Sequence, residues 1–470
     1  MSSAMKNITI QTIQKVCDGI LHGEEWIKEE GKEATGVVLD SRLLEEGYVF
    51  IATKGEKVDG HKFIPSVFEK KALAVICEDV PEVLTGPCIQ VKDSFLALKK
   101  LAAFYRQQLN ITVVGITGSV GKTSTKEFIA GVLGVKYRVW KTQGNFNNEV
   151  GLPLTVLQLR EEHEIAVLEM GISDFGEMHR LSEIAKPDVC VLTNIGQCHL
   201  EFLGDRDGVL RAKSEIFDFM NPKGMIFING DDDKLVTLKE KWQNQILSFG
   251  RNKENDVYAT KEVSQGLLGS TIDMEGTVEL NQVRIPLPGE HMVLNALSAA
   301  AVANYLNLSG DEIREGIKRV RAVGGRSNII PYEDFVLIDD CYNANPVSMK
   351  AAIDLLQSAK GRKVAVLGDM FELGQQEEQL HYEVGVYAKN KVDFIICVGM
   401  LAEQIYEGAL KDKPENMTLL YLRNKDEVYK HLKEIIMPQD TILLKASHGM
   451  GFADIVSWFE RNYLKQELDS

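Results

Sequence analysis

The sequence predicts an α/β protein of three domains: a small α/β N-terminal domain, a central P-loop, parallel-sheet domain of the ATPase type, and a C-terminal doubly wound, Rossmann-like domain. Three observations lead to this prediction. The chain has 470 residues, which is room for roughly two to four domains. Two separate series of apolar runs alternate with helical patterns. A glycine turn also joins the apolar run at 111–117 to a helix.

The first domain is expected over residues 1–108. Short β-like runs at 37–39, 48–52, 74–77 and 88–91 are separated by turn residues. A helical pattern over 94–109, with apolar residues three and four apart, then closes the segment. This mixture predicts a small α/β domain followed by an exit helix.

The central domain is expected over residues 109–321. Continuous apolar runs at 111–117, 165–170, 189–195 and 224–230 alternate with polar turns and helical stretches. This is typical of parallel strands buried on both faces. Residues 256–288 are β-rich, and 289–306 are strongly helical.

The third domain is expected over residues 322–470. Apolar runs at 335–340, 363–370, 394–400, 417–422 and 441–447 are each followed by a helical stretch. Strands and helices in strict alternation indicate a second, doubly wound parallel sheet.

Charge and cysteine content narrow the classes of function. The net charge of -15 argues against nucleic acid as the main partner, because nucleic-acid-binding surfaces are usually basic. No apolar run approaches the ~18 residues of a membrane span. Seven scattered cysteines without a C-x-x-C pair, and an N-terminus without a signal-type apolar segment, favour a cytoplasmic protein. The spacing of Cys190, Cys198 and His199 suits no common structural zinc site.

The stretch GITGSVGKTSTKEF, residues 115–128, has the strand, glycine turn and helix of a P-loop. Gly118 and Gly121 allow backbone N–H groups to face phosphate oxygens at a helix N-terminus. Lys122 can reach the β- and γ-phosphates, and the Thr123 hydroxyl can ligate Mg²⁺. The strict pattern G-x-x-x-x-G-K-[ST] requires glycine where this chain has Ile116. An ordinary strand-to-helix turn with a surface lysine is the alternative.

Three further side chains are candidates for the same edge of the sheet. Glu169 ends a buried strand and could hold Mg²⁺, or could be a solvated strand-end acid. His199 follows the next strand and could bind a metal or substrate, or could be a hydrogen-bonded loop histidine. From its helical position alone, Lys213 is more simply a solvated or snorkelling lysine.

Two polar segments could add ligand contacts. TQGNFNNEVGLP, at 142–153, carries three asparagines between ordered segments, although a plain turn would have the same composition. IDDCYNANP, at 338–346, follows a strand of the third domain. Together with the P-loop, these features indicate a nucleotide-binding, Mg²⁺-dependent enzyme or switch; they do not define a reaction.

Ten segments in one order resemble the Mur ligase family. They are TGSVGKTST, TQGNFNNEVGLP, LEMGIS, TNIGQCHLEFLG, AKSEIF, GEHMVLNALSAAAVA, GRSNII, DDCYNANP, LGDMFELG and KASHGMG. The resemblance spans nearly the whole chain, since DSR at 40–42, GYVFIATKGEKVDGHKFI and Ala72 also fit the family's substrate-binding domain. YNANPVS and LGDMFELG favour the branch that adds a dipeptide over relatives that add single amino acids.

The resemblance implies an ATP-dependent amide ligase of peptidoglycan precursor synthesis. The γ-phosphate of ATP would pass to the terminal carboxylate of UDP-MurNAc-tripeptide, and the amine of D-Ala-D-Ala would attack the acyl phosphate. The implied cofactors are ATP, two Mg²⁺ ions and a CO₂-derived carbamate on Lys213. The implied partners are these small molecules, without nucleic acid or a membrane, and the expected state is a monomer. The third peptide residue stays open between meso-diaminopimelate and L-lysine.

Carried over position by position, the resemblance also implies three groups of site residues. Catalysis would use Lys122, Glu169, His199 and Lys213, with Thr123, Glu169, His199 and carbamylated Lys213 around the metals. ATP would contact Gly118, Ser119, Val120, Gly121, Lys122, Thr123, Ser124, His291, Asn295, Arg326, Asp340, Tyr342 and Asn343. The UDP-tripeptide would contact Ser41, Arg42, Asp59, Gly60 and His61, with Asn145, Asn147 and Asn148 nearer its reacting carboxylate.

Two other functions are weighed against this one. A folylpolyglutamate synthase-like enzyme would share the ligase chemistry, but that branch lacks a dedicated UDP-sugar domain such as the one the DSR and DGH segments indicate. A nucleotide-dependent switch would need a sensor of nucleotide state, and the sequence has no N-K-x-D guanine signature.

Overall fold

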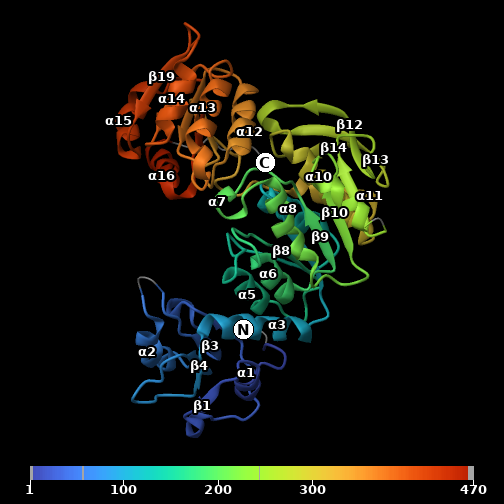
Figure 1. Ribbon diagram of the computed structural model, residues 1–470, viewed down its shortest axis with the longest axis vertical. Helices are drawn as coiled ribbons and strands as arrows, with labels where there is room; N and C mark the ends of the chain where they lie inside the picture. The colour runs from blue at the N-terminus through green and yellow to red at the C-terminus, as the bar shows by residue number, and fades with distance from the viewer. Residues whose placement is uncertain (1–3, 56–57, 243, 464–470) are drawn as a thin grey trace.

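The computed structural model describes residues 4–55, 58–242 and 244–463. Three sheets follow one another along the chain, of five, nine and six strands. In Figure 1 the N-terminal domain lies at the bottom in blue, the central domain in green to yellow, and the C-terminal domain at the top in orange and red. Glu56 and Lys57 of the predicted substrate-binding segment, and the first three residues, lie outside the described residues.

The N-terminal sheet has the order β1-β5-β4-β3-β2, with β1 antiparallel and the other neighbours parallel. Its strands are β1 (Ile20–His22), β2 (Gly36–Val38), β3 (Tyr48–Ile51), β4 (Ala74–Cys77) and β5 (Cys88–Gln90). Its helices are α1 (Ile10–Val16), α2 (Ile64–Glu69) and α3 (Ser94–Gln108). The four predicted strands are present to within a residue. Strand β1 was not predicted, because its residues are exposed or only half-buried and do not form an apolar run.

Helix α3 connects the first domain to the second (Figure 1). Asp93 caps its N-terminus by accepting a hydrogen bond from the Leu96 N–H at 2.9 Å. The Tyr105 side chain is fully buried, and its hydroxyl donates to the Leu159 carbonyl of the central domain at 2.7 Å. The helix packs against α5 (Gly151–Leu157) and α6 (Glu177–Ala185) of the central domain. It therefore not only leads out of the first domain but also packs the two domains together.

The central sheet has the order β14-β13-β12-β11-β10-β9-β6-β8-β7, and it is parallel from β7 to β12. Its strands are β6 (Thr112–Thr117), β7 (Val139–Lys141), β8 (Ile165–Glu169), β9 (Val189–Leu192), β10 (Met225–Asn229), β11 (Ile246–Gly250), β12 (Val257–Ser264), β13 (Ser270–Gly276) and β14 (Leu280–Ile285). Besides α5 and α6, its helices are α4 (Lys122–Leu133), α7 (Leu200–Leu203), α8 (Arg206–Ser214), α9 (Lys239–Trp242), α10 (His291–Tyr305) and α11 (Gly310–Arg319). Strands β7 and β11 were not predicted, because both are only partly buried and do not form continuous apolar runs.

The C-terminal sheet has the order β15-β16-β20-β17-β18-β19, in which only the edge strand β15 is antiparallel among the described strands. Its strands are β15 (Asn328–Pro331), β16 (Val336–Asp339), β17 (Lys363–Gly368), β18 (Phe394–Val398), β19 (Thr418–Leu422) and β20 (Thr441–Lys445). Its helices are α12 (Pro346–Gln357), α13 (Glu377–Ala388), α14 (Ala402–Leu410), α15 (Lys425–Ile435) and α16 (Ala453–Asn462). The predicted doubly wound sheet is confirmed, with β15 added at its edge.

Both faces of the central sheet are covered by helices. Along β6, Val113 packs in the core cluster that includes α3 and α6, whereas Val114 and Ile116 pack in the cluster with α4 and α10. Burial on both faces explains the continuous apolar runs of the sequence. Among the described helices, none combines the length and apolar character needed to span a bilayer.

The strand register brings three chain segments to one edge of the central sheet. Ile116 lies opposite Glu169 of β8 and opposite Val191 of β9. The P-loop after β6, the Glu169 carboxylate and the segment that leads to His199 therefore leave the sheet together, at its carboxyl end. Ligands of open α/β sheets bind at this end.

Candidate active site

A cavity of about 530 Å³ lies between the central and C-terminal domains. Most of the predicted nucleotide and metal residues line it: Ser119, Val120, Gly121, Lys122, Thr123, Ser124, Glu169, His199, His291, Asn295, Arg326, Asp340, Tyr342 and Asn343. Two of the predicted substrate residues, Asn147 and Asn148, line it as well. Predicted residues from both domains thus meet around one space.

The P-loop has the backbone that its glycines were expected to provide. A Cβ atom added to Gly118 would lie 1.9 Å from Oγ1 of Thr193, and Gly121 has φ +82° just before α4. Ile116 is a buried residue within β6. The departure from the strict motif therefore means that the strand continues to Thr117 and the loop begins at Gly118.

Lys122 folds back over the loop, with Nζ donating to the Gly118 carbonyl at 2.9 Å. Burial lowers the pKa of its amine, with a smaller opposing effect from the Glu169 carboxylate. An anion entering the loop would restore a full counter-charge to this ammonium group, because opposite charge favours the protonated form.

Asn194, which was not predicted as a site residue, supports the P-loop from behind. Its carbonyl accepts from the Ser119 N–H and its Oδ1 from the Val120 N–H, each at 3.0 Å. The Thr193 hydroxyl donates to the Val120 carbonyl at 2.6 Å. The position of Asn194 two residues after β9, at the carboxyl edge, was the sequence signal that could have identified it.

The Glu169 carboxylate is 1% exposed and is held on both oxygens. Oε2 accepts from the Thr123 hydroxyl and Oε1 from Nδ2 of Asn147, each at 2.8 Å. A carboxylate and a hydroxyl oxygen side by side at a P-loop fit Mg²⁺, which commonly takes one or two protein oxygens and completes its shell with phosphate and water. The solvated strand-end alternative for Glu169 is wrong, since the side chain is buried.

Lys126 is a second unpredicted site residue, on the turn of α4 after the P-loop. Its side chain is 2% exposed, and Nζ donates to the Thr142 carbonyl at 2.8 Å. Nζ also lies 3.3 Å from Oε1 of Glu127 and 3.8 Å from Oε2 of Glu169. The ammonium group supplies positive charge beside the buried Glu169 carboxylate and anchors the start of the asparagine-rich loop.

His199 is the residue before α7 and has a left-handed backbone, φ +51°. Its Nδ1 lies 2.8 Å from Oε2 of Glu372, from the C-terminal domain, but off the line of a good hydrogen bond. Burial is the largest effect on its imidazole and lowers the pKa of His199. The ring therefore favours the neutral form, which can bind a metal ion.

Lys213 is 1% exposed on α8, so the solvated or snorkelling alternative is wrong. Burial lowers the pKa of its amine to about 8, and the charge of Lys122 acts in the same direction. Lys213 does not itself line the cavity, although it is close enough to His199 and Lys122, which do, for their charges to interact. A fraction of its amine is thus uncharged near neutral pH, and an uncharged amine is the form that reacts with CO₂.

On the C-terminal side, the Arg326 guanidinium lies 3.9 Å from the centre of the Tyr342 ring. Asp340 accepts from the Ser327 N–H at 2.9 Å and pairs with Nζ of Lys445 at 2.6 Å. Lys445, at the end of β20, also lines the cavity and was not predicted. These contacts hold the interdomain segment around Arg326 against the end of β16.

Helix α10 closes the cavity on the central-domain side. Asn295 accepts from the Thr125 hydroxyl at 2.9 Å, which ties α10 to α4. Burial lowers the pKa of His291 at the start of the helix. The lining also includes the buried Phe249 and the apolar side chain of Leu294, which can contact a flat heterocycle.

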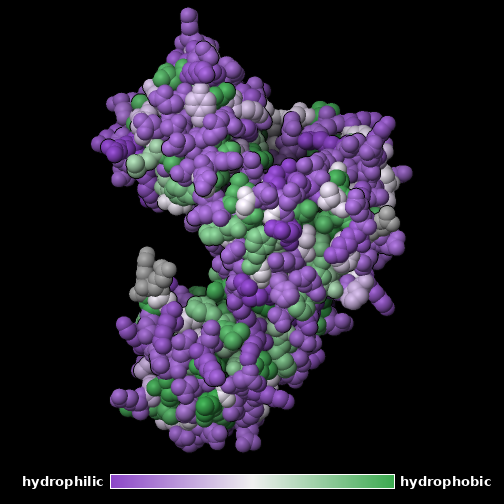
Figure 2. All heavy atoms as spheres, viewed as in Figure 1, coloured by the Kyte–Doolittle hydropathy of each residue, from purple (hydrophilic) through white to green (hydrophobic). Residues whose placement is uncertain are grey.

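The predicted substrate residues of the N-terminal domain do not line this cavity. Arg42 makes a bidentate pair with Asp40, and the Asp59 carboxylate accepts from the His61 N–H at 3.0 Å and contacts its ring at 2.7 Å. All follow β2 or β3, at the carboxyl edge of their own sheet. Figure 2 shows an open gap between the N-terminal and C-terminal domains, with the central domain as its wall. Asn145 is exposed and also lies away from the cavity.

Three family models match successive parts of the chain. They are described as "Mur ligase family, catalytic domain" over residues 33–106, "Mur ligase middle domain" over 116–303 and "Mur ligase, glutamate ligase domain" over 325–448. The chain belongs to the Mur ligase family.

Relatives and solved structures in the Mur ligase family match almost the full length. The UDP-N-acetylmuramoyl-tripeptide--D-alanyl-D-alanine ligase of Bacillus subtilis is 40% identical, over 95% of this chain and 97% of that protein. MurF from Acinetobacter baumannii has a TM-score of 0.87 at 32% identity, over 98% of this chain and 100% of that one. MurF ligase from Thermotoga maritima, solved in complex with ADP, has a TM-score of 0.78 at 30% identity, over 91% and 97%.

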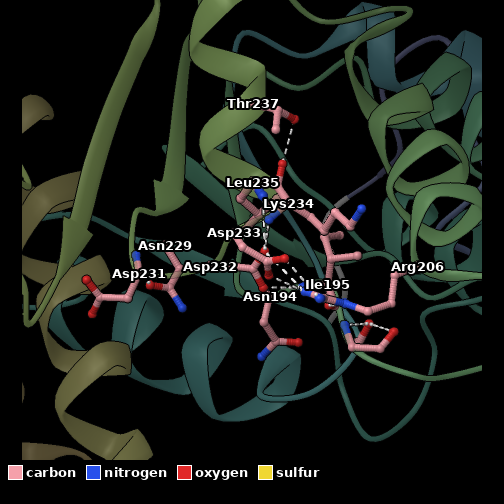
Figure 3. Close-up of polar contacts among 12 residues, drawn as sticks. Asn194, Ile195, Arg206, Asn229, Asp231, Asp232, Asp233, Lys234, Leu235 and Thr237 are labelled. Atoms are coloured by element: carbon pink, nitrogen blue, oxygen red, sulfur yellow. Dashed lines mark hydrogen bonds and ion pairs between the residues drawn. The ribbon is translucent and has the colours of Figure 1, made fainter.

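In this Mur ligase, a polar network joins the His199 loop to the helix that carries Lys213. Figure 3 shows Arg206, at the start of α8, reaching both Ile195 and Asp233. Its Nε donates to the Ile195 carbonyl at 2.8 Å, and the Ile195 N–H donates to Oδ2 of Asp232 at 2.8 Å. Both main-chain groups of Ile195 are thus held. The three consecutive aspartates after β10 were not recognised in the sequence as part of the site.

Proposed function

We propose that this Mur ligase joins D-alanyl-D-alanine to UDP-N-acetylmuramoyl-tripeptide with ATP, in the synthesis of peptidoglycan precursors. Relatives whose names state this activity align with nearly the whole chain. The observation that carries the proposal is the cavity in which the P-loop and the Thr123–Glu169 pair face Arg326 and Tyr342 of the C-terminal domain. A nucleotide bound there would contact both domains.

The chemistry is carboxylate activation followed by aminolysis. The terminal carboxylate of the tripeptide attacks the γ-phosphorus of ATP, which forms an acyl phosphate and releases ADP. The amine of D-alanyl-D-alanine then attacks the acyl carbon, an amide bond forms, inorganic phosphate leaves and the amine loses a proton. Activation is needed because a carboxylate is a poor electrophile. The Lys122 ammonium and the Arg326 guanidinium are placed to neutralise the transferring phosphoryl group.

Two groups of residues would hold Mg²⁺. Thr123 and Glu169 fit a first ion beside the P-loop, and His199 with a carbamylated Lys213 would hold a second. When bound, Mg²⁺ neutralises phosphate charge and orients the phosphate oxygens. The carbamate forms when the uncharged Lys213 amine adds to CO₂ and releases a proton, which replaces a cation with an anion. The burial of Lys213 and its lowered pKa, about 8, support this step.

The remaining predicted residues would contact the nucleotide or the UDP-tripeptide. The P-loop residues Gly118 to Ser124, with His291 and Asn295, would contact the nucleotide from the central domain. Asp340, Tyr342 and Asn343 would contact it from the C-terminal domain, and exclusion of water between the domains would protect the acyl phosphate. Ser41, Arg42, Asp59, Gly60 and His61 would bind the UDP moiety, with Asn145, Asn147 and Asn148 nearer the tripeptide end.

We place the domain boundaries after residues 108 and 321, because the three sheets occupy 20–90, 112–285 and 328–445. We expect a monomer that acts in the cytoplasm on small molecules, without nucleic acid or a membrane as partner.

Phosphate release tests the proposed reaction. It is measured with ATP alone, with ATP and either acceptor, and with ATP, UDP-MurNAc-tripeptide and D-alanyl-D-alanine together. We expect turnover only with all three substrates, and a product of the mass of the pentapeptide. Strong turnover with ATP alone would favour a nucleotide switch. Turnover with a folate and glutamate, but not with the UDP-tripeptide, would favour the folylpolyglutamate branch.

A further inference from the structure

A contact between two domains falls on the candidate metal ligand His199. Its Nδ1 lies 2.8 Å from Oε2 of Glu372, which belongs to the loop after β17 of the C-terminal domain. His199 lines the cavity together with the P-loop, and its side chain is 25% exposed. Glu372 is therefore an acid that the third domain presents to the catalytic edge of the second.

Both residues of the contact have strained backbones. Glu372 has φ +63° and His199 has φ +51°, in the left-handed region that side chains other than glycine rarely adopt. Such strain persists only where the surrounding structure enforces it, and it gathers at functional sites. Glycine would adopt the positive φ at position 372 without strain, so the backbone of this loop does not by itself call for a glutamate there.

The loop that carries Glu372 is fixed from within the C-terminal domain. The Met370 N–H donates to Nε2 of the buried His381 at 2.8 Å, and the Phe371 N–H donates to Oγ of Ser447 at 2.9 Å. Two successive peptide groups before Glu372 are thus anchored. The glutamate side chain, 57% exposed, extends from this fixed base toward α7.

The contact determines which ring nitrogen of His199 is available. An imidazole that binds a metal usually donates its other N–H to a carboxylate, which fixes the tautomer and the ring orientation. With Glu372 beside Nδ1, Nε2 is the nitrogen with a free lone pair. Among the described residues, Nδ1 has no hydrogen-bond acceptor of good geometry. Oε2 of Glu372 is already within hydrogen-bond distance at 2.8 Å, so the two side chains have only to align for the Nδ1–H to be accepted.

We propose that Glu372 is a positioning residue: it accepts the Nδ1–H of His199 across the domain interface and so presents Nε2 to the metal site. The His199 imidazole is then held in the orientation for the second Mg²⁺ only when the C-terminal domain is docked on the central domain. This inference rests on the proposed role of His199 as a metal ligand. It couples formation of the acyl phosphate to the docking of the domain that helps to enclose it.

The test uses graded changes at Glu372 in the full-length enzyme. Glu372→Gly removes the acceptor and also relieves the positive φ, so folding should be preserved. Glu372→Gln keeps an oxygen that can accept from Nδ1–H. Glu378→Gln, an exposed acid on the next helix, is the matched control. The readouts are kcat and KM, the affinity for Mn²⁺ in the presence of ADP by electron paramagnetic resonance, and Tm.

For Glu372→Gly we expect kcat and the affinity of the weaker Mn²⁺ site to fall by about 10-fold or more. KM for the UDP-tripeptide and Tm should stay close to wild type. Glu372→Gln should keep most of the activity and Mn²⁺ affinity that Glu372→Gly loses. Glu378→Gln should match wild type. If Glu372 had only a structural role, Mn²⁺ affinity would not depend on whether residue 372 carries an oxygen that can accept the Nδ1–H of His199. Wild-type kcat and Mn²⁺ affinity in Glu372→Gly would overturn the proposal.

His199→Ala separates this inference from the proposed function. If His199→Ala loses Mn²⁺ affinity and activity while Glu372→Gly retains both, His199 keeps its role and the positioning role of Glu372 is rejected. If His199→Ala also binds Mn²⁺ and turns over as wild type does, the assignment of His199 as a metal ligand fails, and the role of Glu372 fails with it.

Discussion

Nζ of Lys126 lies 3.8 Å from Oε2 of Glu169, and the two side chains are 2% and 1% exposed. Removal of one member of a buried ion pair leaves an uncompensated charge, at a cost of about 3–5 kcal/mol. We therefore expect Lys126→Met to lower the free energy of unfolding by roughly 3 kcal/mol, measured by urea denaturation. Lys141→Met is the control, because Lys141 pairs with Glu127 nearer the surface and should cost less than about 1 kcal/mol. Equal losses would contradict a special role for Lys126.

Gly118 should tolerate no side chain. A Cβ atom there would lie 1.9 Å from the Thr193 hydroxyl oxygen, which itself supports the P-loop through Val120. We expect Gly118→Ala to weaken ADP binding by roughly tenfold or more, about 1.4 kcal/mol, because the loop must move to make room. Isothermal titration calorimetry measures the change. Gly31→Ala, at φ +74° with open space around it, carries backbone strain without a clash and should bind ADP normally.

Lys213 should be replaceable in part by a small carboxylate. If a carbamate on Lys213 supports the second Mg²⁺, Lys213→Ala loses that anion and should lose activity by about 100-fold. Acetate or formate should then restore part of the turnover, because the vacated space can hold a carboxylate. Phosphate release with and without acetate measures the effect, with Arg211→Ala on the same helix as the control. Full activity of Lys213→Ala without any supplement would remove this residue from the site.

The sequence predicted the parts of the fold that depend on continuous burial. The strands around Val113 and Leu443 form apolar runs because helices cover both faces, and such runs are visible without coordinates. Strands β1, β7 and β15 are three or four residues long and lie at sheet edges, where partial burial leaves no periodic signal. Their existence depends on a neighbouring strand rather than on their own residues.

The candidate site was predictable where the chemistry lies next to a strand end, as for Thr123, Glu169 and His199. Lys126 and Glu372 were not predictable in the same way, since each acts through a partner distant in the chain. The sequence does not distinguish a lysine on the exposed face of a helix from one such as Lys126, which is buried beside Glu169. Lys213 was assigned to the site only through the family resemblance, because its helical position alone is that of a surface lysine; its 1% exposure shows that it is buried.

The stability of the C-terminal domain should fall in acid through His381. This imidazole is fully buried, with Nε2 accepting from Met370 and Nδ1 facing the Glu377 carbonyl at 2.6 Å. Burial lowers the pKa of His381 below 6.5, against weaker opposing effects from Glu377 and Asp369. The unfolded chain therefore binds more protons once the pH falls below about 6.5, so stability is fully present above that pH and is lost toward the folded-state pKa.

Urea denaturation at about pH 7.5 and about pH 5.5 measures this dependence. We expect His381→Gln to be less stable than wild type at both pH values, because the glutamine amide cannot reproduce the two hydrogen-bond contacts of the buried His381 ring. Its loss of stability between the two pH values should nevertheless be smaller than that of the wild type. An identical pH difference in the two proteins would assign the acid sensitivity to other titratable groups.

Arg206 should matter to turnover although it does not line the cavity. Its Nε donates to the Ile195 carbonyl at 2.8 Å and its guanidinium pairs with Asp233, which fixes the start of α8 against the loop that leads to His199 (Figure 3). Arg206→Lys keeps the charge but loses the planar fork, so it cannot hold both partners in the same way. We expect Arg206→Ala to lose about 1 kcal/mol of stability and Arg206→Lys somewhat less.

The decisive readout for Arg206 is the protection of residues 194–199 against amide hydrogen exchange. Arg206→Ala should raise exchange in this segment and lower kcat several-fold, since the His199 loop and the helix of Lys213 would no longer be tied together. Arg211→Ala removes a cation from the exposed face of the same helix, where it lies over the Phe175 ring, and should leave exchange at 194–199 unchanged. Equal exchange in the two variants would mean that Asp232 alone holds Ile195, through its contact with the Ile195 N–H.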